Sequence, residues 1–169
     1  MDAAALKAMQ APIKERYRGE PEAALVTLRA EGTLDEGSIA CKVETGRALA
    51  VAGLHPATGG SGLELCSGDM LLEALVACAG VTLKAVATAL GIELRSGTVK
   101  AEGDLDFRGT LGVDKAAPVG FRNIRLAFDV DTDAPQDQVD TLLKLTERYC
   151  VVFQTIKERP QLDVELRRA

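Results

Sequence analysis

The sequence contains no tryptophan and a single histidine, and its aromatic residues amount to only 4%. The core must therefore be built from Leu, Val, Ile and Ala, and each alanine buries little apolar area. Burial of further apolar surface against a second copy would offset that weakness, so an oligomer fits this composition. The single histidine, His55, argues against a Ser-His-Asp hydrolase, because it would have to serve as the base. With no Cys-x-x-Cys or His-x-x-x-His pair present, no metal site is expected.

The sequence also lacks an excess of basic residues, since 20 Lys and Arg stand against 25 Asp and Glu, for a net charge of −5. A nucleic-acid partner usually requires a basic patch, and the short basic clusters here are interrupted by acids or very brief. No basic N-terminal region precedes an apolar core, and the most apolar run, 70–90, contains Glu73 and Lys84. We therefore expect a soluble cytoplasmic protein with neither a nucleic-acid nor a membrane partner. In that compartment its four cysteines are expected to be free or redox-active rather than structural disulfides.

Hydrophobic periodicity predicts runs of strands separated by single helices, which is typical of an α+β fold with antiparallel pairing. We expect an N-terminal helical extension over 1–20 and one domain over 21–169. The expected elements are a helix at 1–18, strands at 25–28, 39–44 and 48–51, a helix at 69–90, strands at 98–107 and 124–130, a helix from Asp133 to just before Pro160, and a strand at 162–166. Turn or loop structure is expected at 31–38 and 53–68.

Helix-end signals support the two long helices. Ser67 or Asp69 is expected to cap the first one, with Gly91 just past its end. Asp133 and Gln136 have the spacing of a capping box at the start of the second.

Two cysteines fall on the two long predicted helices. Cys78 lies in the middle of the first helix, and Cys150 lies late in the second. Each cysteine alone is more often a small buried hydrophobe than a reactive thiol. Cys66, just before the first long helix, is the alternative reactive thiol because helix N-termini lower thiol pKa values. Cys41 alternates with apolar residues on a predicted strand and is expected to face the core.

The segment 67–78, Ser-Gly-Asp-Met-Leu-Leu-Glu-Ala-Leu-Val-Ala-Cys, resembles the signature of the OsmC/Ohr family around its first reactive cysteine. A glycine-rich loop precedes that helix in the family, as the loop 59–62 does here. The segment 146–150, Thr-Glu-Arg-Tyr-Cys, is similar to the text around the family's second cysteine. Together, in this order and separation, the motifs are fairly specific for the family, and we expect its OsmC-like branch.

The resemblance implies an intertwined homodimer in which antiparallel sheets wrap around two long central helices, with sites at the subunit interface. It implies a thiol-dependent peroxidase that reduces organic hydroperoxides in an oxidative stress response, with Cys78 peroxidatic and Cys150 resolving. The disulfide formed between them would be reduced by an external dithiol, and no cofactor is expected.

The chain departs from the family pattern at the groups that activate the thiolate. The family pairs an arginine of its first hairpin with a glutamate about ten residues before the first cysteine, whereas Gly68 stands there, beside Asp69. Arg108 is our first choice for the missing guanidinium, with Arg47 and Arg29 as others. The alternative hypothesis is a non-catalytic protein of this fold that binds a small apolar ligand at the dimer interface.

Overall fold

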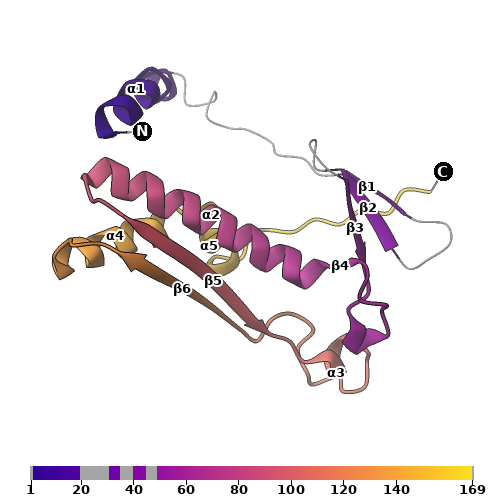
Figure 1. Ribbon diagram of the computed structural model, residues 1–169. Coiled ribbons are helices and arrows are strands. Elements are labelled where there is room, and N and C mark those ends of the chain that lie inside the picture. The colour runs from indigo at the N-terminus through magenta and orange to yellow at the C-terminus, as the bar shows by residue number, and fades with distance from the viewer. Residues whose placement is uncertain (1, 20–30, 35–39, 45–48, 169) are drawn as a thin grey trace.

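Helix α2 (Ser67–Leu90) runs through the middle of the computed structural model, which describes residues 2–19, 31–34, 40–44 and 49–168 (Figure 1). The architecture is α+β, as predicted. The other elements, in chain order, are α1 (Ala3–Gly19), β1 (Glu31–Leu34), β2 (Ala40–Glu44), β3 (Leu49–Gly53), the 3-10 turn η2 (Pro56–Thr58), β4 (Leu65–Cys66), β5 (Ser96–Asp104), α3 (Phe107–Thr110), β6 (Asn123–Asp131), α4 (Gln136–Tyr149) and α5 (Val151–Lys157).

The strands form two separate sheets. Strands β1, β2 and β3 form an antiparallel meander, and the two-residue strand β4 pairs parallel to β3 and leads directly into α2. Strands β5 and β6 form an antiparallel ribbon whose register runs from Ser96↔Asp131 to Asp104↔Asn123. Along both strands exposed residues alternate with half-buried ones, so one face of the ribbon packs inward.

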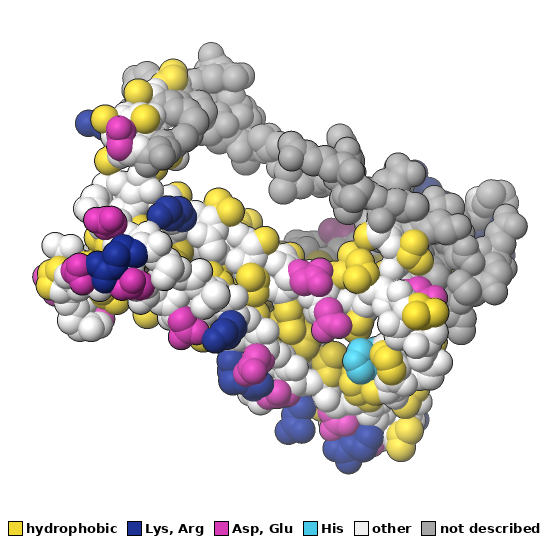
Figure 2. Space-filling model, viewed as in Figure 1, with side chains coloured by type: hydrophobic (Ala, Val, Ile, Leu, Met, Phe, Trp, Pro, Cys, Tyr) yellow, Lys and Arg dark blue, Asp and Glu magenta, His cyan; other side chains and the backbone are white. Residues whose placement is uncertain are grey.

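The outward face of the ribbon carries charges of both signs. Arg125 pairs with Glu102 and Asp104, and Lys100 pairs with Asp129 at 2.8 Å. Figure 2 shows basic and acidic side chains interleaved over the part of the molecule formed by the ribbon. Exposed pairs of this kind contribute little stability, so the inward face decides where the ribbon packs.

Two clusters of buried side chains lie along α2. Leu83, Ala87, Ile92 and Leu142 form the first, toward the C-terminal end of α2 and against α4. Leu75, Ala79 and Cys150 form the second, with β5, β6 and α5 packed around it. By length and composition α2 is the one helix among the described residues that could cross a membrane. A helix in the core of a protein meets the same criteria, and one side of α2 is buried in the core here.

The structure confirms the predicted C-terminal end of α2 but not its predicted N-cap. Gly91 is its C-cap in the left-handed region, with φ 71°, as predicted. The predicted N-cap is wrong, because Cys66 occupies that position with extended backbone and makes no side-chain capping bond. Strand β4 carries extended backbone up to Cys66, which places Ser67 and Asp69 inside the helix.

The second long helix is the largest correction to the predicted elements. It is divided at Cys150, whose backbone is extended (φ −73°, ψ 106°) and which ends α4 and begins α5. The predicted capping box is also wrong, because Pro135 is the N-cap of α4 and no side chain caps that end. Apolar periodicity continues across the break, so periodicity alone could not reveal it.

Three shorter predictions also need correction. Residues 31–34 form strand β1 rather than a turn, and Phe107 begins the short helix α3 rather than ending a strand. The predicted last strand at 162–166 does not form within the described residues, where it belongs to neither sheet, and Leu162, Val164 and Leu166 are 83%, 97% and 87% exposed. An alternating segment becomes a strand only when another strand pairs with it, and the described part of one chain supplies none here. The predicted strand at 25–28 lies outside the described residues.

The first prediction concerns two neighbouring leucines of α4. Leu142 is 2% exposed and belongs to the core, whereas Leu143 is 43% exposed. We expect Leu142→Ala to lower the free energy of unfolding by about 2–5 kcal/mol, because it removes buried methyl groups and leaves a cavity. The matched Leu143→Ala change should cost less than half as much. Urea unfolding followed by circular dichroism measures both, and equal losses would contradict this assignment of the core.

Candidate functional site

Cys78 and Cys150 come together where α2 meets the break between α4 and α5. Cys78 is half-buried on the face of α2 that carries Leu75 and Ala79, and Cys150 is 1% exposed. Cys78 packs against the buried cluster that contains Cys150. Two cysteines that are 72 positions apart in the sequence therefore form one site.

Helix α5 supplies further donors to the sulfur of Cys78. Burial pushes the pKa of the Cys78 thiol upward, but hydrogen bonds from the N–H of Val152, the thiol of Cys150, the N–H of Val151 and the hydroxyl of Thr82 outweigh it, so that the pKa is lowered. The first N–H groups of a helix have no partner within that helix, so Val151 and Val152 are free to donate to a thiolate. A cysteine in this position is more acidic than its apolar surroundings alone would allow.

Cys150 is shifted in the opposite direction. Burial raises the pKa of its thiol, the N–H of Phe153 opposes that rise, and the bond and charge of Cys78 add to it. When two interacting acids share a site, the loss of one proton makes loss of the other harder. The pair therefore favours a thiolate at Cys78 beside a protonated thiol at Cys150.

The environment of the pair is apolar. Val99, Ile124, Phe128 and Val152 are among the half-buried side chains packed against the cluster that contains Cys150. The main groups that lower the pKa of the Cys78 thiol are backbone amides, a thiol and a hydroxyl rather than a neighbouring cation.

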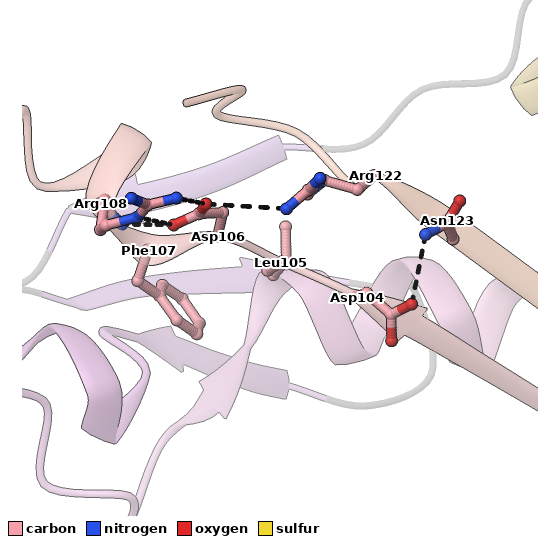
Figure 3. Close-up of a pocket in the computed structure, with 7 residues that line it drawn as sticks. All are labelled: Asp104, Leu105, Asp106, Phe107, Arg108, Arg122 and Asn123. Atoms are coloured by element: carbon pink, nitrogen blue, oxygen red, sulfur yellow. Dashed lines mark hydrogen bonds and ion pairs between the residues drawn. The ribbon is translucent and has the colours of Figure 1, made fainter. Parts of the chain in front are cut away.

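Arg108 belongs to a different part of the molecule. Its guanidinium donates to Asp106, with Nε–Oδ1 at 3.0 Å and Nη2–Oδ2 at 2.6 Å, and lies 3.6 Å from Asp114. Arg108 and Asp106 line an open pocket of about 510 Å³, and Figure 3 shows Arg122 as well as Arg108 directed at Asp106. Arg108 above all, and Arg122 more weakly, hold the pKa of Asp106 at about 2. The pocket is lined by the end of β5, the start of β6 and α3, and neither Cys78 nor Cys150 lines it.

Asp69 lies exposed in the first turn of α2. It lines a shallow, mostly apolar groove of about 400 Å³ between α2 and β5, together with Val76 and Ala77. The groove thus reaches the residue next to Cys78. Acidic residues are favourable in the first turn of a helix, which is the role the structure gives to Asp69.

The remaining predicted residues have varied positions. Cys66 is half-buried at the start of α2, and its sulfur lies beside Gly68. Cys41 belongs to β2, where it pairs in register with Ala52, and its side chain lies outside the described residues. Arg29 and Arg47 also lie outside them.

Sequence reasoning missed two contributors to the site, the amides that begin α5 and the hydroxyl of Thr82. Thr82 follows Cys78 by four residues, so the two side chains lie on one face of α2, and this spacing is visible in the sequence. The amides of Val151 and Val152 have no comparable signal, because they are available only where the helix breaks.

The OsmC-like protein family matches residues 60–165 of the chain, which include both cysteines. No curated protein matches the sequence. Among solved structures, the fold is similar to that of an OsmC-like protein from Mycoplasma pneumoniae, with a TM-score of 0.65, 16% identity and 79% of this chain aligned to 89% of that one.

Two further structures are organic hydroperoxide resistance proteins. For the one from Legionella pneumophila the TM-score is 0.61 at 20% identity, with 80% of this chain aligned to 92% of that one. For the one from Elizabethkingia anophelis it is 0.63 at 15% identity, with 80% and 91% aligned. At these identities the structures establish a shared fold. From the match over residues 60–165 and the shared fold, we conclude that the chain belongs to the OsmC-like protein family.

Proposed function

We propose that the protein is a thiol-dependent peroxidase that reduces organic hydroperoxides with Cys78 and Cys150. The observation that carries the proposal is the packing of Cys78 against the buried cluster that contains Cys150. The opposite pKa directions, lowered at Cys78 and raised at Cys150, support it. The naming of two structural neighbours as organic hydroperoxide resistance proteins supports the choice of substrate.

The reaction has two oxidative steps. The Cys78 thiolate attacks one oxygen of the peroxide, the O–O bond breaks, and the alkoxide leaves and takes up a proton to become the alcohol. Cys78 is then a sulfenic acid. The sulfur of Cys150 displaces its hydroxyl, forming the S–S bond and releasing water, with the second hydrogen of that water coming from the Cys150 thiol. An external dithiol reduces the disulfide by thiol exchange.

The thiolate is activated here mainly by backbone dipoles rather than by a neighbouring guanidinium. The N–H groups of Val151 and Val152 stabilise negative charge on Cys78. To orient a bound peroxide, Arg108 would first have to give up its ion pair with Asp106. Asp69 would act from the groove that it lines together with Ala77. The apolar cluster around the pair favours an alkyl hydroperoxide over hydrogen peroxide.

We further propose a homodimer. Val81 is 72% exposed on α2, on the side opposite the buried stripe of Leu75, Ala79, Leu83 and Ala87. The extended segment 162–168 likewise offers a strand that another chain can pair. Pairing two copies of α2 through this side would cover its apolar surface. We also propose that the protein is cytoplasmic and that α1 is an extension outside the OsmC-like domain.

The peroxidase proposal predicts loss of two thiols when the reduced protein meets an organic hydroperoxide. Cys78→Ser should abolish the rapid loss, and Cys150→Ser should leave a sulfenic acid at Cys78 that dimedone traps. Free-thiol counts and mass spectrometry of the linked peptides measure both. If Cys78 and Cys150 both stay reduced after treatment, the peroxidase is excluded and the apolar-ligand hypothesis takes its place.

A second prediction concerns pH. Because the pKa of Cys78 is lowered by folding, its alkylation by iodoacetamide should persist to lower pH in the native protein than in urea. The rate should fall only as the pH drops through the lowered pKa, where the thiolate is protonated. Cys150→Ala removes one donor and should move the midpoint up, whereas Cys150→Ser keeps a hydroxyl donor and should move it less. Native and unfolded midpoints that coincide would contradict the proposed activation.

The dimer is tested with two valines that are equally exposed in the single chain. Val81 on α2 is 72% exposed and Val113 in the loop after α3 is 73% exposed. We expect Val81→Lys to convert the protein to monomers in light-scattering chromatography, because it places charge in the proposed interface. Val113→Lys should leave the dimer intact. A wild-type chain that already elutes as a monomer would rule the interface out.

A further inference from the structure

Three basic side chains line one pocket at the break between α4 and α5. Lys144 and Arg148 stand four residues apart on one face of α4, and Lys157 is the last residue of α5. All three are exposed, and the open pocket between them measures about 850 Å³. It is also lined by Leu145, Glu147, Tyr149 and Gln154. A volume of this size is in the range of small-molecule sites.

The charges of this pocket are not neutralised as those of the ribbon are. Both basic side chains of the β5–β6 ribbon are paired with carboxylates. Among the described residues, Lys144, Arg148 and Lys157 have no ion pair, and Arg148 instead lies over the ring of Tyr149, 5.8 Å from its centroid. Their positive charge therefore acts on ions that approach from solvent.

The pocket borders the redox pair. Tyr149 directly precedes Cys150, and the backbone N–H of Gln154 donates to the carbonyl oxygen of Cys150 at 2.9 Å. The side chain of Gln154 donates to the carbonyl oxygen of Glu147 at 2.7 Å, across the break. With a rise of about 1.5 Å per helical residue, the Cα atom of each cation lies within about 12 Å of that of Cys150. This separation is close to the Debye length of about 10 Å at 0.1 M salt, so the field of the pocket reaches the pair.

The sign of this field is opposite to that of the whole molecule. The chain has a net charge of −5, which slows the approach of an anion in general. The pocket has three cations against one lining carboxylate, that of Glu147. A local positive field raises the concentration of anions at one place on an otherwise repelling surface, and here that place is beside Cys150.

We propose that the reductant of the Cys78–Cys150 disulfide is a small anionic dithiol, which Lys144, Arg148 and Lys157 attract to the site. The inference rests on the proposed function, since it identifies the chemical class of the external dithiol that closes the cycle.

The reduction is an exchange in two steps. One thiolate of the dithiol attacks the sulfur of Cys78, which is half-buried whereas Cys150 is 1% exposed. A bond forms between the two sulfurs, the Cys78–Cys150 bond breaks, and Cys150 leaves and takes up a proton. The second thiol of the reductant gives its proton to solvent, attacks the first and displaces Cys78 as a thiolate. The reductant departs as a cyclic disulfide, oxidised by the two electrons that the protein disulfide gains.

The test compares two dithiols of similar structure, the anion dimercaptopropanesulfonate and the neutral dimercaptopropanol. Diamide first forms the Cys78–Cys150 disulfide in the full-length protein. Each dithiol is then added at about 10 mM ionic strength, where the Debye length is about 30 Å. Alkylation and mass spectrometry of the Cys78 and Cys150 peptides give the rate of reduction. The ratio of the anionic to the neutral rate constant measures the effect of charge.

Two triple variants change the net charge equally. The pocket variant removes the three cations: Lys144→Gln, Arg148→Gln and Lys157→Gln. The control variant removes three exposed basic residues that do not line the pocket: Lys7→Gln, Lys115→Gln and Arg168→Gln. We expect the ratio to fall roughly fourfold in the pocket variant, because three charges each act over about 10 Å of water. The control should lower it by less than half as much. Equal falls in the two variants, or an unchanged ratio in the pocket variant, would overturn the inference.

The salt dependence of the wild type provides a second measurement that needs no substitution. At about 1 M salt the Debye length is about 3 Å, so the field of the pocket no longer reaches the pair. The ratio should therefore fall as salt is added. Repulsion by the net charge alone would make it rise, and a rise would refute the inference.

Peroxide reactivity is judged separately, because diamide forms the disulfide without a peroxide. A protein that organic hydroperoxide leaves reduced, but whose ratio falls in the pocket variant, keeps the anion-attracting pocket and loses the peroxidase. A protein that peroxide oxidises, but whose ratio is the same in both variants, keeps the peroxidase and loses the role of the pocket. If diamide cannot link Cys78 to Cys150, both are wrong.

Discussion

The contact between the middle of α2 and the start of α5 is the interaction on which the rest of the site depends. It buries Cys150, brings its thiol to Cys78, and directs the free N–H groups of Val151 and Val152 at one sulfur. Each effect needs the others, because burial without the amides would raise the pKa of both thiols. With the amides present, the pKa of Cys78 falls while that of Cys150 rises. A pair made of one nucleophilic thiolate and one protonated thiol requires this difference.

The break at Cys150 makes this arrangement possible. A continuous helix from Gln136 to Lys157 would direct each N–H group at the carbonyl four residues earlier, and none would remain for Cys78. The extended backbone of Cys150 frees the first amides of α5 at the cost of interrupting the helix. The apolar side chains of α5, including Phe153 and Ile156, pack against the core and hold this short helix in place despite the break.

The described chain also leaves apolar surface uncovered on α2 and along the segment 162–168. In a protein with few aromatic residues and an alanine-rich central helix, such surface is costly to leave in water. The same scarcity of bulky side chains lets α2 approach its neighbours closely. A composition that weakens the single chain therefore favours both close helix packing and association with a second copy.

The sequence by itself determined the α+β class, most of the helices and strands, the left-handed Gly91 that ends α2, and the family resemblance through Cys78 and Cys150. These follow from local periodicity, turn chemistry and motif spacing, which act over a few residues. Only the tertiary structure decided that α4 ends at Cys150, that 162–166 has no strand partner within the described chain, and that Arg108 lines a pocket which neither Cys78 nor Cys150 lines. Each of these outcomes depends on which distant segments the packed fold brings together, because free amides and strand edges take whichever partner lies opposite, and local sequence carries no record of that partner.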